Sequence, residues 1–302
     1  MVKDFERRMP LNAAALLAAQ LDPIEHTYGP KDCILYALGV GLGYDPTNED
    51  ELAFVAGKNP KVLPTFPVVM GYDAFWLDNP DFGLTWTHTV HGEETVTLHA
   101  PIPPQGTVIG RERVVDVIDK GEGKGGLVFH ERTITDKATG TLLATLKQTT
   151  FCRADGGFGG TPGAARRDTP PVHAIPDRAP DLVCDLPTRP EMALIYSLSG
   201  DTNPLHSEPA FAREAGFPRP ILHGLATMGV AGHALLKSVC GYNPERLKVM
   251  SVRFSTPVFP GETIRTEMWQ DANTAGAVVS FRARVKERDA VVINNGRAEI
   301  II

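Results

Sequence analysis

A glycine- and proline-rich segment, residues 153–180, divides this chain of 302 residues into two nearly equal parts. Five residues of the segment are glycine and five are proline. Proline lacks the backbone N–H that helices and inner strands require, and glycine weakens both kinds of element. The segment therefore forms neither a helix nor a central strand. We predict an N-terminal half at 1–152, a linker at 153–180 and a C-terminal half at 181–302.

The two halves share one order of predicted elements, helices first and then alternating segments typical of strands. In the N-terminal half we expect a helix at 32–40 and strands at 95–98, 107–118, 126–136 and 141–151. In the C-terminal half we expect helices at 191–197 and 222–239, and strands at 247–254, 263–271, 277–286 and 290–301. A similar Pro/Gly corner, 101–107 and 257–263, joins two strands in each half. The pattern indicates an α+β fold built by duplication of one domain.

Charge and composition exclude several classes of protein. The formal net charge is −6 and no run of Lys or Arg forms a basic stripe, so we expect no nucleic-acid or membrane partner. The N-terminus lacks the apolar core of a signal peptide, and no apolar stretch is long enough to span a bilayer. The four cysteines are widely separated, which is typical of reduced thiols. We predict a cytoplasmic protein.

The segment 196–206, YSLSGDTNPLH, carries the densest group of chemically active residues. Pro204 ends any helix before it, so Asp201, Asn203 and His206 are expected on an irregular loop, with a new helix starting near Ser207. A carboxylate, an amide and an imidazole so close together can act as an acid–base site. The alternative is a turn cap, in which Asp and Asn only satisfy loop amides. Neither a metal site nor a nucleophile elbow is indicated, because the loop has no further His or Cys and the chain has no G-x-S-x-G.

A long apolar helix begins close to His223-Gly224 and is apolar on nearly every face, which predicts that it is buried all round. Its small residues, such as Gly229 and Gly232, are expected to let strands approach closely. The free N–H groups at its start carry partial positive charge and can hold a developing oxyanion. The alternative is that this helix start serves core packing alone.

The 196–206 segment resembles the signature of the MaoC-like, or type 2, enoyl-CoA hydratases. Other segments resemble the hydratase 2 part of the peroxisomal multifunctional enzyme of β-oxidation, and the resemblance extends from about Leu21 to the end of the chain. These further segments are 37–41, 63–66, 91–93, 156–160, 220–224 and 266–269.

The resemblance implies a double hot-dog fold, in which each half is an antiparallel sheet wrapped around a central helix. The helix at 222–239 would be the central helix of the C-terminal half, and its N-terminal counterpart would include Pro67–Gly71 and the residues that follow. The N-terminal half has no matching Asp/Asn/His motif. We therefore expect one active site per chain, with the N-terminal half making room for the acyl chain.

The resemblance also implies the activity, reversible addition of water to trans-2-enoyl-CoA with a (3R)-3-hydroxyacyl-CoA product in fatty-acid β-oxidation. Asp201 and His206 match the catalytic pair, Asn203 matches the amide that supports them, and the N–H of Gly224 matches the donor to the thioester oxygen. A homodimer without metal or cofactor is expected. Candidates to bind the CoA phosphates are Arg219, Arg246, Lys248 and Arg253.

Three alternatives stay open at this point. The chain can be a hydratase of the same fold for a branched or steroid-like acyl group, a hot-dog thioesterase, or a non-catalytic acyl-CoA-binding protein. A thioesterase does not need the Asp/Asn/His loop, and the complete set of Asp201, Asn203 and His206 disfavours a pure binding role.

Overall fold

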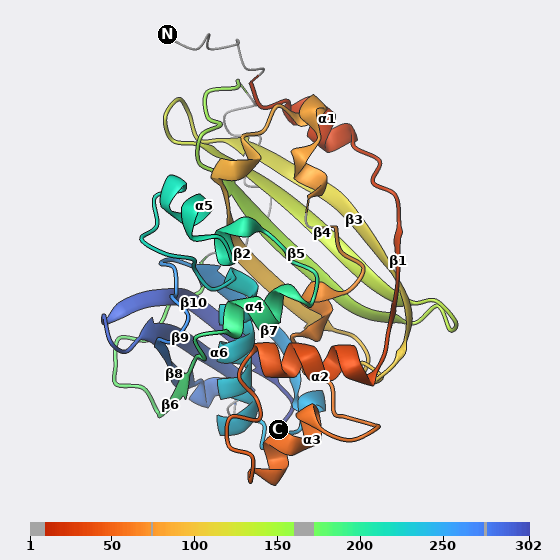
Figure 1. The fold of residues 1–302 in the computed structure, drawn as a ribbon, viewed down its shortest axis with the longest axis vertical. Coiled ribbons are helices and arrows are strands. Elements are labelled where there is room, and N and C mark those ends of the chain that lie inside the picture. The colour runs from red at the N-terminus through yellow and green to blue at the C-terminus, as the bar shows by residue number, and fades with distance from the viewer. Residues whose placement is uncertain (1–9, 74, 160–171, 275–276) are drawn as a thin grey trace.

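The computed structural model of the chain describes residues 10–73, 75–159, 172–274 and 277–302. Its strands form one antiparallel sheet of ten strands (Figure 1). In chain order they are β1 (Ile24–Tyr28), β2 (Thr89–Leu98), β3 (Gly106–Asp119), β4 (Gly126–Asp136), β5 (Leu142–Cys152), β6 (Leu182–Pro187), β7 (Leu247–Phe254), β8 (Thr263–Gln270), β9 (Val278–Val285) and β10 (Ala290–Ile300). The order across the sheet is β1-β3-β4-β5-β2-β7-β10-β9-β8-β6.

The α-helices of the described residues are short except for two. They are α1 (Ala13–Ala18), α2 (Pro30–Gly39), α3 (Glu49–Val55), α4 (Met192–Ser197), α5 (Pro209–Glu214) and α6 (Gly224–Ser238). The predicted helices at 32–40, 191–197 and 222–239 are confirmed as α2, α4 and α6, and the helix expected near Ser207 is α5. The eight predicted strands are also present, whereas β1, β6, α1 and α3 were not predicted.

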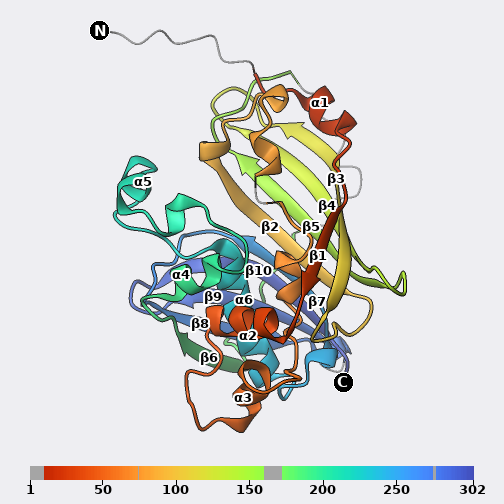
Figure 2. The ribbon, with the colours of Figure 1, turned by 45° about the vertical axis from the view of Figure 1, so that its right-hand side comes forward.

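Each half of the chain occupies its own side of the sheet, and the two sides meet where β2 pairs with β7. In that pair Glu94 lies opposite Val252, and Val96 lies opposite Met250. Figure 2 shows the five N-terminal strands above the five C-terminal ones, with α6 lying in the curve of the latter. Every residue of α6 from Leu225 to Leu236 is buried, as its all-round apolarity predicts.

The small residues of α6 admit a strand residue, as expected, since a Cβ at Gly232 would lie 3.4 Å from Sδ of Met250 in β7, and they also admit residues of the N-terminal half. A Cβ added at Gly229 would lie 2.4 Å from Cγ1 of Val40, which caps the C-terminus of α2. A Cβ added at Gly232 would lie 2.9 Å from Cγ2 of Thr65. The glycines of α6 therefore seat N-terminal residues against the central helix, and the two halves share one apolar core.

The N-terminal half has no long central helix within its described residues, so the expectation of a helix that includes Pro67–Gly71 is wrong. The segment forms short 3-10 turns instead, η1 (Phe66–Val69), η2 (Trp76–Asp78), η3 (Pro80–Phe82) and η4 (Trp86–His88). Prolines 67 and 80 and the left-handed glycines 71 and 83 interrupt any longer helix. The turns lie against the sheet where a central helix would otherwise lie (Figure 1).

Backbone contact between Gly110 of β3 and Gly71 holds this segment on the sheet. A Cβ at Gly110 would lie 2.1 Å from the carbonyl oxygen of Gly71, so the Gly110→Ala variant must move one of the two backbones. We expect a loss of roughly 2–3 kcal/mol in the free energy of unfolding, measured by urea denaturation. Gly106→Ala is the control on the same strand, because its Cβ would lie 3.6 Å from the nearest atom, Tyr28 Oη. Equal stability of the two variants would contradict this prediction.

Among the residues that the structure describes, no helix has the length and apolarity needed to cross a membrane. All four cysteines are described, and each is a free, buried thiol, as predicted from their spacing.

Candidate active site

The loop between α4 and α5 holds Asp201, Asn203 and His206 in place through two short turns. The backbone N–H of Asn203 donates to Oδ1 of Asp201 at 3.1 Å, and the N–H of Leu205 donates to Oδ1 of Asn203 at 3.0 Å. Pro204 then opens η5 (Pro204–His206). The turn-cap role considered from the sequence is therefore present at both Asp201 and Asn203, but the side chain of His206 has other partners.

His206 is buried, and one of its ring nitrogens is bound to the backbone. Its Nδ1 lies 2.8 Å from the carbonyl oxygen of Ile221, and because a carbonyl only accepts, Nδ1 carries the hydrogen. Burial lowers the pKa of His206 below the ordinary histidine value, although Asp201 and the bond to Ile221 oppose this shift. At neutral pH the ring is therefore uncharged, and Nε2 keeps a free lone pair that can accept a proton.

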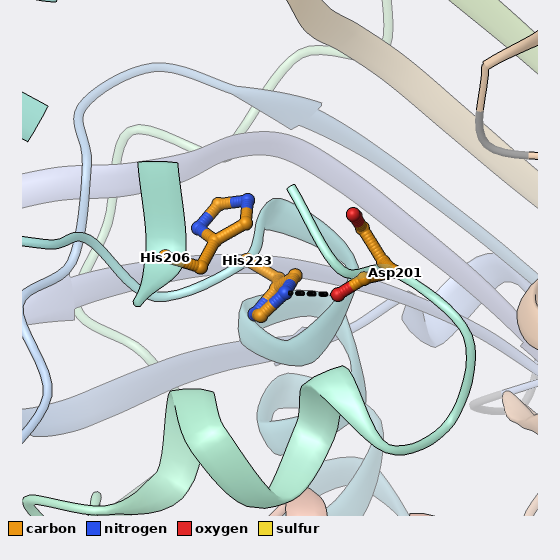
Figure 3. Close-up of side chains that lie close together, drawn as sticks. All are labelled: Asp201, His206 and His223. Atoms are coloured by element: carbon orange, nitrogen blue, oxygen red, sulfur yellow. Dashed lines mark hydrogen bonds between the residues drawn. The ribbon is translucent and has the colours of Figure 1, made fainter. Parts of the chain in front are cut away.

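His223 joins the two predicted acid–base residues, and the sequence analysis did not assign it a role in the site. Its ring stacks against that of His206, with centroids 3.6 Å apart and planes inclined by 27°. Its Nε2 donates to the backbone carbonyl of Asp201 at 3.1 Å. Figure 3 shows the Asp201 carboxylate and the His206 ring on the same side of His223. The only sequence signal was its place before Gly224, which we read as a helix start.

The titration of His223 makes a testable contribution to stability. Burial, reinforced by the neighbouring His206, lowers the pKa of His223 to about 2. In the unfolded state His223 binds a proton with an ordinary pKa of about 6.5. Below that pH the proton stabilises the unfolded chain but not the folded one, so the free energy of unfolding decreases as the pH falls. The unfolding free energy of the wild type should fall between pH 7 and pH 5. In His223→Phe, which lacks this histidine, the fall should be smaller by about 2 kcal/mol. An identical loss in both proteins, measured by urea denaturation, would contradict the assignment.

Gly224 is the first residue of α6 and follows directly on His223. Its backbone N–H has no acceptor within the helix, because the first N–H groups of a helix have none. The Phe254 ring lies beside it, 3.5 Å from the position that a Cβ would take. The N–H and the positive end of α6 are thus set next to His223, which contacts both Asp201 and His206.

Two of the four candidate cations are close in sequence to residues of the site. Arg253 precedes Phe254 on β7, but consecutive strand residues face opposite sides of the sheet, and the exposed Arg253 side chain has its Nε 3.8 Å from Glu93. Arg219 lies two residues before Ile221, and its Nη1 donates to the carbonyl of Pro260 at 3.2 Å.

The other two cations lie at the opposite end of β7. Lys248 is six residues from Phe254, which is about 20 Å along a strand. Arg246 precedes the strand, and its Nε donates to the carbonyl of Ile301 at 2.8 Å. The structure does not bring Arg246 and Lys248 next to the acid–base loop, since strand direction separates residues that are close in sequence.

Asp201, His206 and His223 also place their potential metal-ligand atoms within 4.8 Å of one another. One nitrogen of each ring, Nδ1 of His206 and Nε2 of His223, already binds a backbone carbonyl. The remaining Nε2 of His206 is open beside Asp201, an arrangement that suits proton transfer. That the protein uses no metal stays a prediction.

Two five-stranded antiparallel halves joined in one curved sheet, with the central helix α6 in the C-terminal half, place the chain among double hot-dog proteins. A Mycobacterium tuberculosis protein described as having a double hotdog fold aligns over 93% of this chain and 96% of its own, with a TM-score of 0.57 and 15% identity. A MaoC-like dehydratase from Phytophthora capsici aligns over 96% of this chain and 99% of its own, with a TM-score of 0.82 and 35% identity.

Sequence comparison identifies the family. A family model for the MaoC like domain matches residues 171–291, and one for the MFE-2 hydratase 2 N-terminal domain matches residues 26–154. The peroxisomal enoyl-CoA hydratase 2 of Arabidopsis thaliana is 39% identical over 93% of this chain and 93% of its own length. The chain belongs to the MaoC-like, hydratase 2 family.

Proposed function

We propose that this protein is an (R)-specific enoyl-CoA hydratase of fatty-acid metabolism, a hydro-lyase that adds water reversibly to trans-2-enoyl-CoA. The observation that carries the proposal is the uncharged, buried His206 with its free Nε2, held beside the Asp201 carboxylate and the start of α6. The family supports the same reaction, since relatives are named as enoyl-CoA hydratases and as a 3-hydroxyacyl-thioester dehydratase.

In this mechanism the thioester carbonyl accepts a hydrogen bond from the Gly224 N–H. Water attacks C3, the C2=C3 electron pair moves toward the carbonyl, and the resulting enolate oxygen is stabilised by that N–H and by the positive end of α6. A hydrogen bond of this kind lowers the free energy of the transition state by about 3–4 kcal/mol.

His206 and Asp201 transfer the proton of the attacking water. Nε2 of His206 takes a proton from the attacking water, while the Asp201 carboxylate accepts a hydrogen bond from the other hydrogen of that water. The charge of Asp201 favours the imidazolium that forms, which agrees with its upward effect on the pKa of His206. The imidazolium then returns the proton to C2, so that hydrogen and hydroxyl add to the same face. Asn203 keeps the loop in shape through its bonds to Asp201 and Leu205.

The C-terminal half would carry the single active site, because the N-terminal half lacks an Asp/Asn/His loop. Arg219 and Arg253 would bind the CoA phosphates. The domain boundaries, a homodimer and a cytoplasmic location stay predictions, and the Arabidopsis relative is named as peroxisomal.

Separate readouts distinguish hydration from thioester cleavage. Purified protein is mixed with trans-2-enoyl-CoA, and both the conjugated-enoyl absorbance and the free thiol are followed. The proposal predicts loss of absorbance without thiol release. Thiol release would identify a thioesterase, and tight binding with neither change would identify a binding protein.

A further inference from the structure

His223 is a buried histidine at the start of α6, and packing and helix capping do not account for it. Its side chain makes no capping hydrogen bond to the helix that it precedes. The residue is 1% exposed, and its Nδ1 has no partner among the described residues. A buried polar atom without a partner costs free energy, whereas an apolar side chain would fill the same space without that cost. The other two features of the ring, its Nε2–H and its face, contact the proposed acid–base pair.

The Nε2–H of His223 holds the backbone at Asp201 in place. It donates to the Asp201 carbonyl at 3.1 Å, and the Oγ of Ser197 lies 3.4 Å from the same nitrogen. Asp201 follows the left-handed Gly200 (φ 123°) and lies outside any helix or strand, between α4 and η5. The hydrogen bond from His223 therefore ties an irregular loop to the start of the buried helix α6 (Figure 3).

The ring face of His223 supports the ring of His206. The two ring centroids are 3.6 Å apart, and the planes are inclined by 27°. The hydrogen bond from Nδ1 of His206 to the carbonyl of Ile221 fixes one atom of that ring. The stacked neighbour restricts the ring plane, so that the two contacts together set the direction of Nε2. Tyr196 of α4 packs against His223 in turn, with centroids 4.8 Å apart, and is fully buried.

His223 stays uncharged beside the proposed general base. Burial and the neighbouring His206 lower its pKa to about 2, and the other groups near the two rings are the Asp201 carboxylate and the Tyr196 hydroxyl. Burial raises the pKa of that hydroxyl well above its ordinary value, so it is uncharged as well. A cation 3.6 Å from His206 would repel the imidazolium that forms during the reaction, and an uncharged ring does not.

We propose that His223 is a positioning residue of the hydratase reaction, whose Nε2–H fixes the backbone of Asp201 and whose ring face fixes the ring of His206. With only 1% of its surface exposed, it acts on the substrate through these two residues alone. The inference rests on the proposed hydratase function and adds a third residue to its acid–base group.

Two variants remove the two contacts separately. His223→Gln keeps an N–H that reaches the Asp201 carbonyl but removes the ring, whereas His223→Phe keeps the ring face but removes the N–H. Each should lower kcat by roughly tenfold, because a displacement of about 1 Å at a catalytic group can cost about 10²-fold. The KM should stay nearly unchanged, since neither variant touches the substrate. Wild-type kcat in either variant would overturn the inference.

A double-variant cycle separates positioning from a general loss of structure. If His223 acts only through the pair, His223→Gln and His223→Phe should not slow the His206→Gln enzyme further, because the pair is already broken there. A structural role would repeat the full loss in the His206→Gln background, and that result would overturn the inference.

His233→Gln is the matched control. His233 is a buried histidine of the same helix, and its ring nitrogens also lack hydrogen-bond partners among the described residues. It lies about 15 Å further along α6, where its Nε2 is 3.6 Å from Glu51. The control should keep wild-type kcat at a temperature at which circular dichroism shows all variants to be folded. Equal losses of kcat at positions 223 and 233 would contradict the inference.

Nuclear magnetic resonance tests the positioning without turnover. In the free protein, the Nδ1–H of His206 should give a proton signal that is protected from exchange with water, because it is bonded to Ile221. The signal should persist in His223→Phe and be lost to exchange in His223→Gln. Equal protection in the wild type and His223→Gln would overturn the inference. Loss of the signal in His223→Gln, together with no hydration by the wild type, would sink the hydratase function alone.

Discussion

The variant His206→Gln should hydrate trans-2-enoyl-CoA with a kcat lower by roughly 10²–10⁴-fold, the usual range for loss of a general acid–base group. Glutamine can still donate to the Ile221 carbonyl, as Nδ1 of His206 does, but it offers no nitrogen lone pair to the attacking water. The KM should change much less, because the imidazole acts on the water rather than on the CoA.

Asp201→Asn should cause a loss of similar size, since an amide cannot stabilise the imidazolium by its charge. The double variant should be little slower than either single one, because groups that act as a unit are not additive. His99→Gln is the matched control, as this histidine is exposed and pairs with Thr145 away from the loop. Near wild-type kcat in either His206→Gln or Asp201→Asn would refute the assignment of the pair.

The second large effect is expected at Gly224, where Gly224→Pro removes the proposed oxyanion donor. Proline is well accepted at the first position of a helix, and the extended conformation of His223 (φ −56°, ψ 139°) is the one favoured before proline. The fold should therefore persist while kcat falls by roughly 10²–10³-fold. Circular dichroism and thermal unfolding check the first statement, and steady-state kinetics check the second.

Gly224→Ala is the companion variant. It keeps the N–H and adds a Cβ at an ordinary contact distance of 3.5 Å from the Phe254 ring. Its loss of kcat should be much smaller than that of Gly224→Pro. Equal losses would show that space beside Phe254, rather than the N–H, is what matters at this position.

The long strands and α6 were predictable because their patterns are strong. β4 alternates between buried and partly exposed residues over most of its length, and α6 is apolar all round, so each pattern has one interpretation. The missed strands β1 and β6 form the two edges of the sheet. Each has only five or six residues, and β6 ends in Pro187, which only an edge or a strand end accepts. Short edge strands carry too little periodicity to be recognised.

The central helix was expected in the N-terminal half only because the C-terminal half and the resembling family have one. Pro67, Pro80 and the left-handed Gly71 and Gly83 already opposed it, and the structure follows these local signals. The place of the helix is taken by short turns, and Gly71 between them contacts Gly110 of the sheet.

Within the proposed site, sequence reasoning found the residues of one loop and missed those brought there by the fold. Asp201, Asn203 and His206 lie within six residues, and Pro204 fixes them on a loop. His223 reaches the same place through a stacking contact across seventeen residues of chain. No spacing rule predicts such a contact.

The central claim is that the site interconverts an enoyl thioester and its (3R)-hydroxy product. The most direct measurement is the reverse reaction on resolved (3R)- and (3S)-3-hydroxyacyl-CoA, followed as the appearance of enoyl absorbance. The account predicts that only the (3R) form is dehydrated and that the reaction stops at an equilibrium reached equally from the enoyl side. Dehydration of the (3S) form, or of neither form by folded protein that binds both, would contradict it.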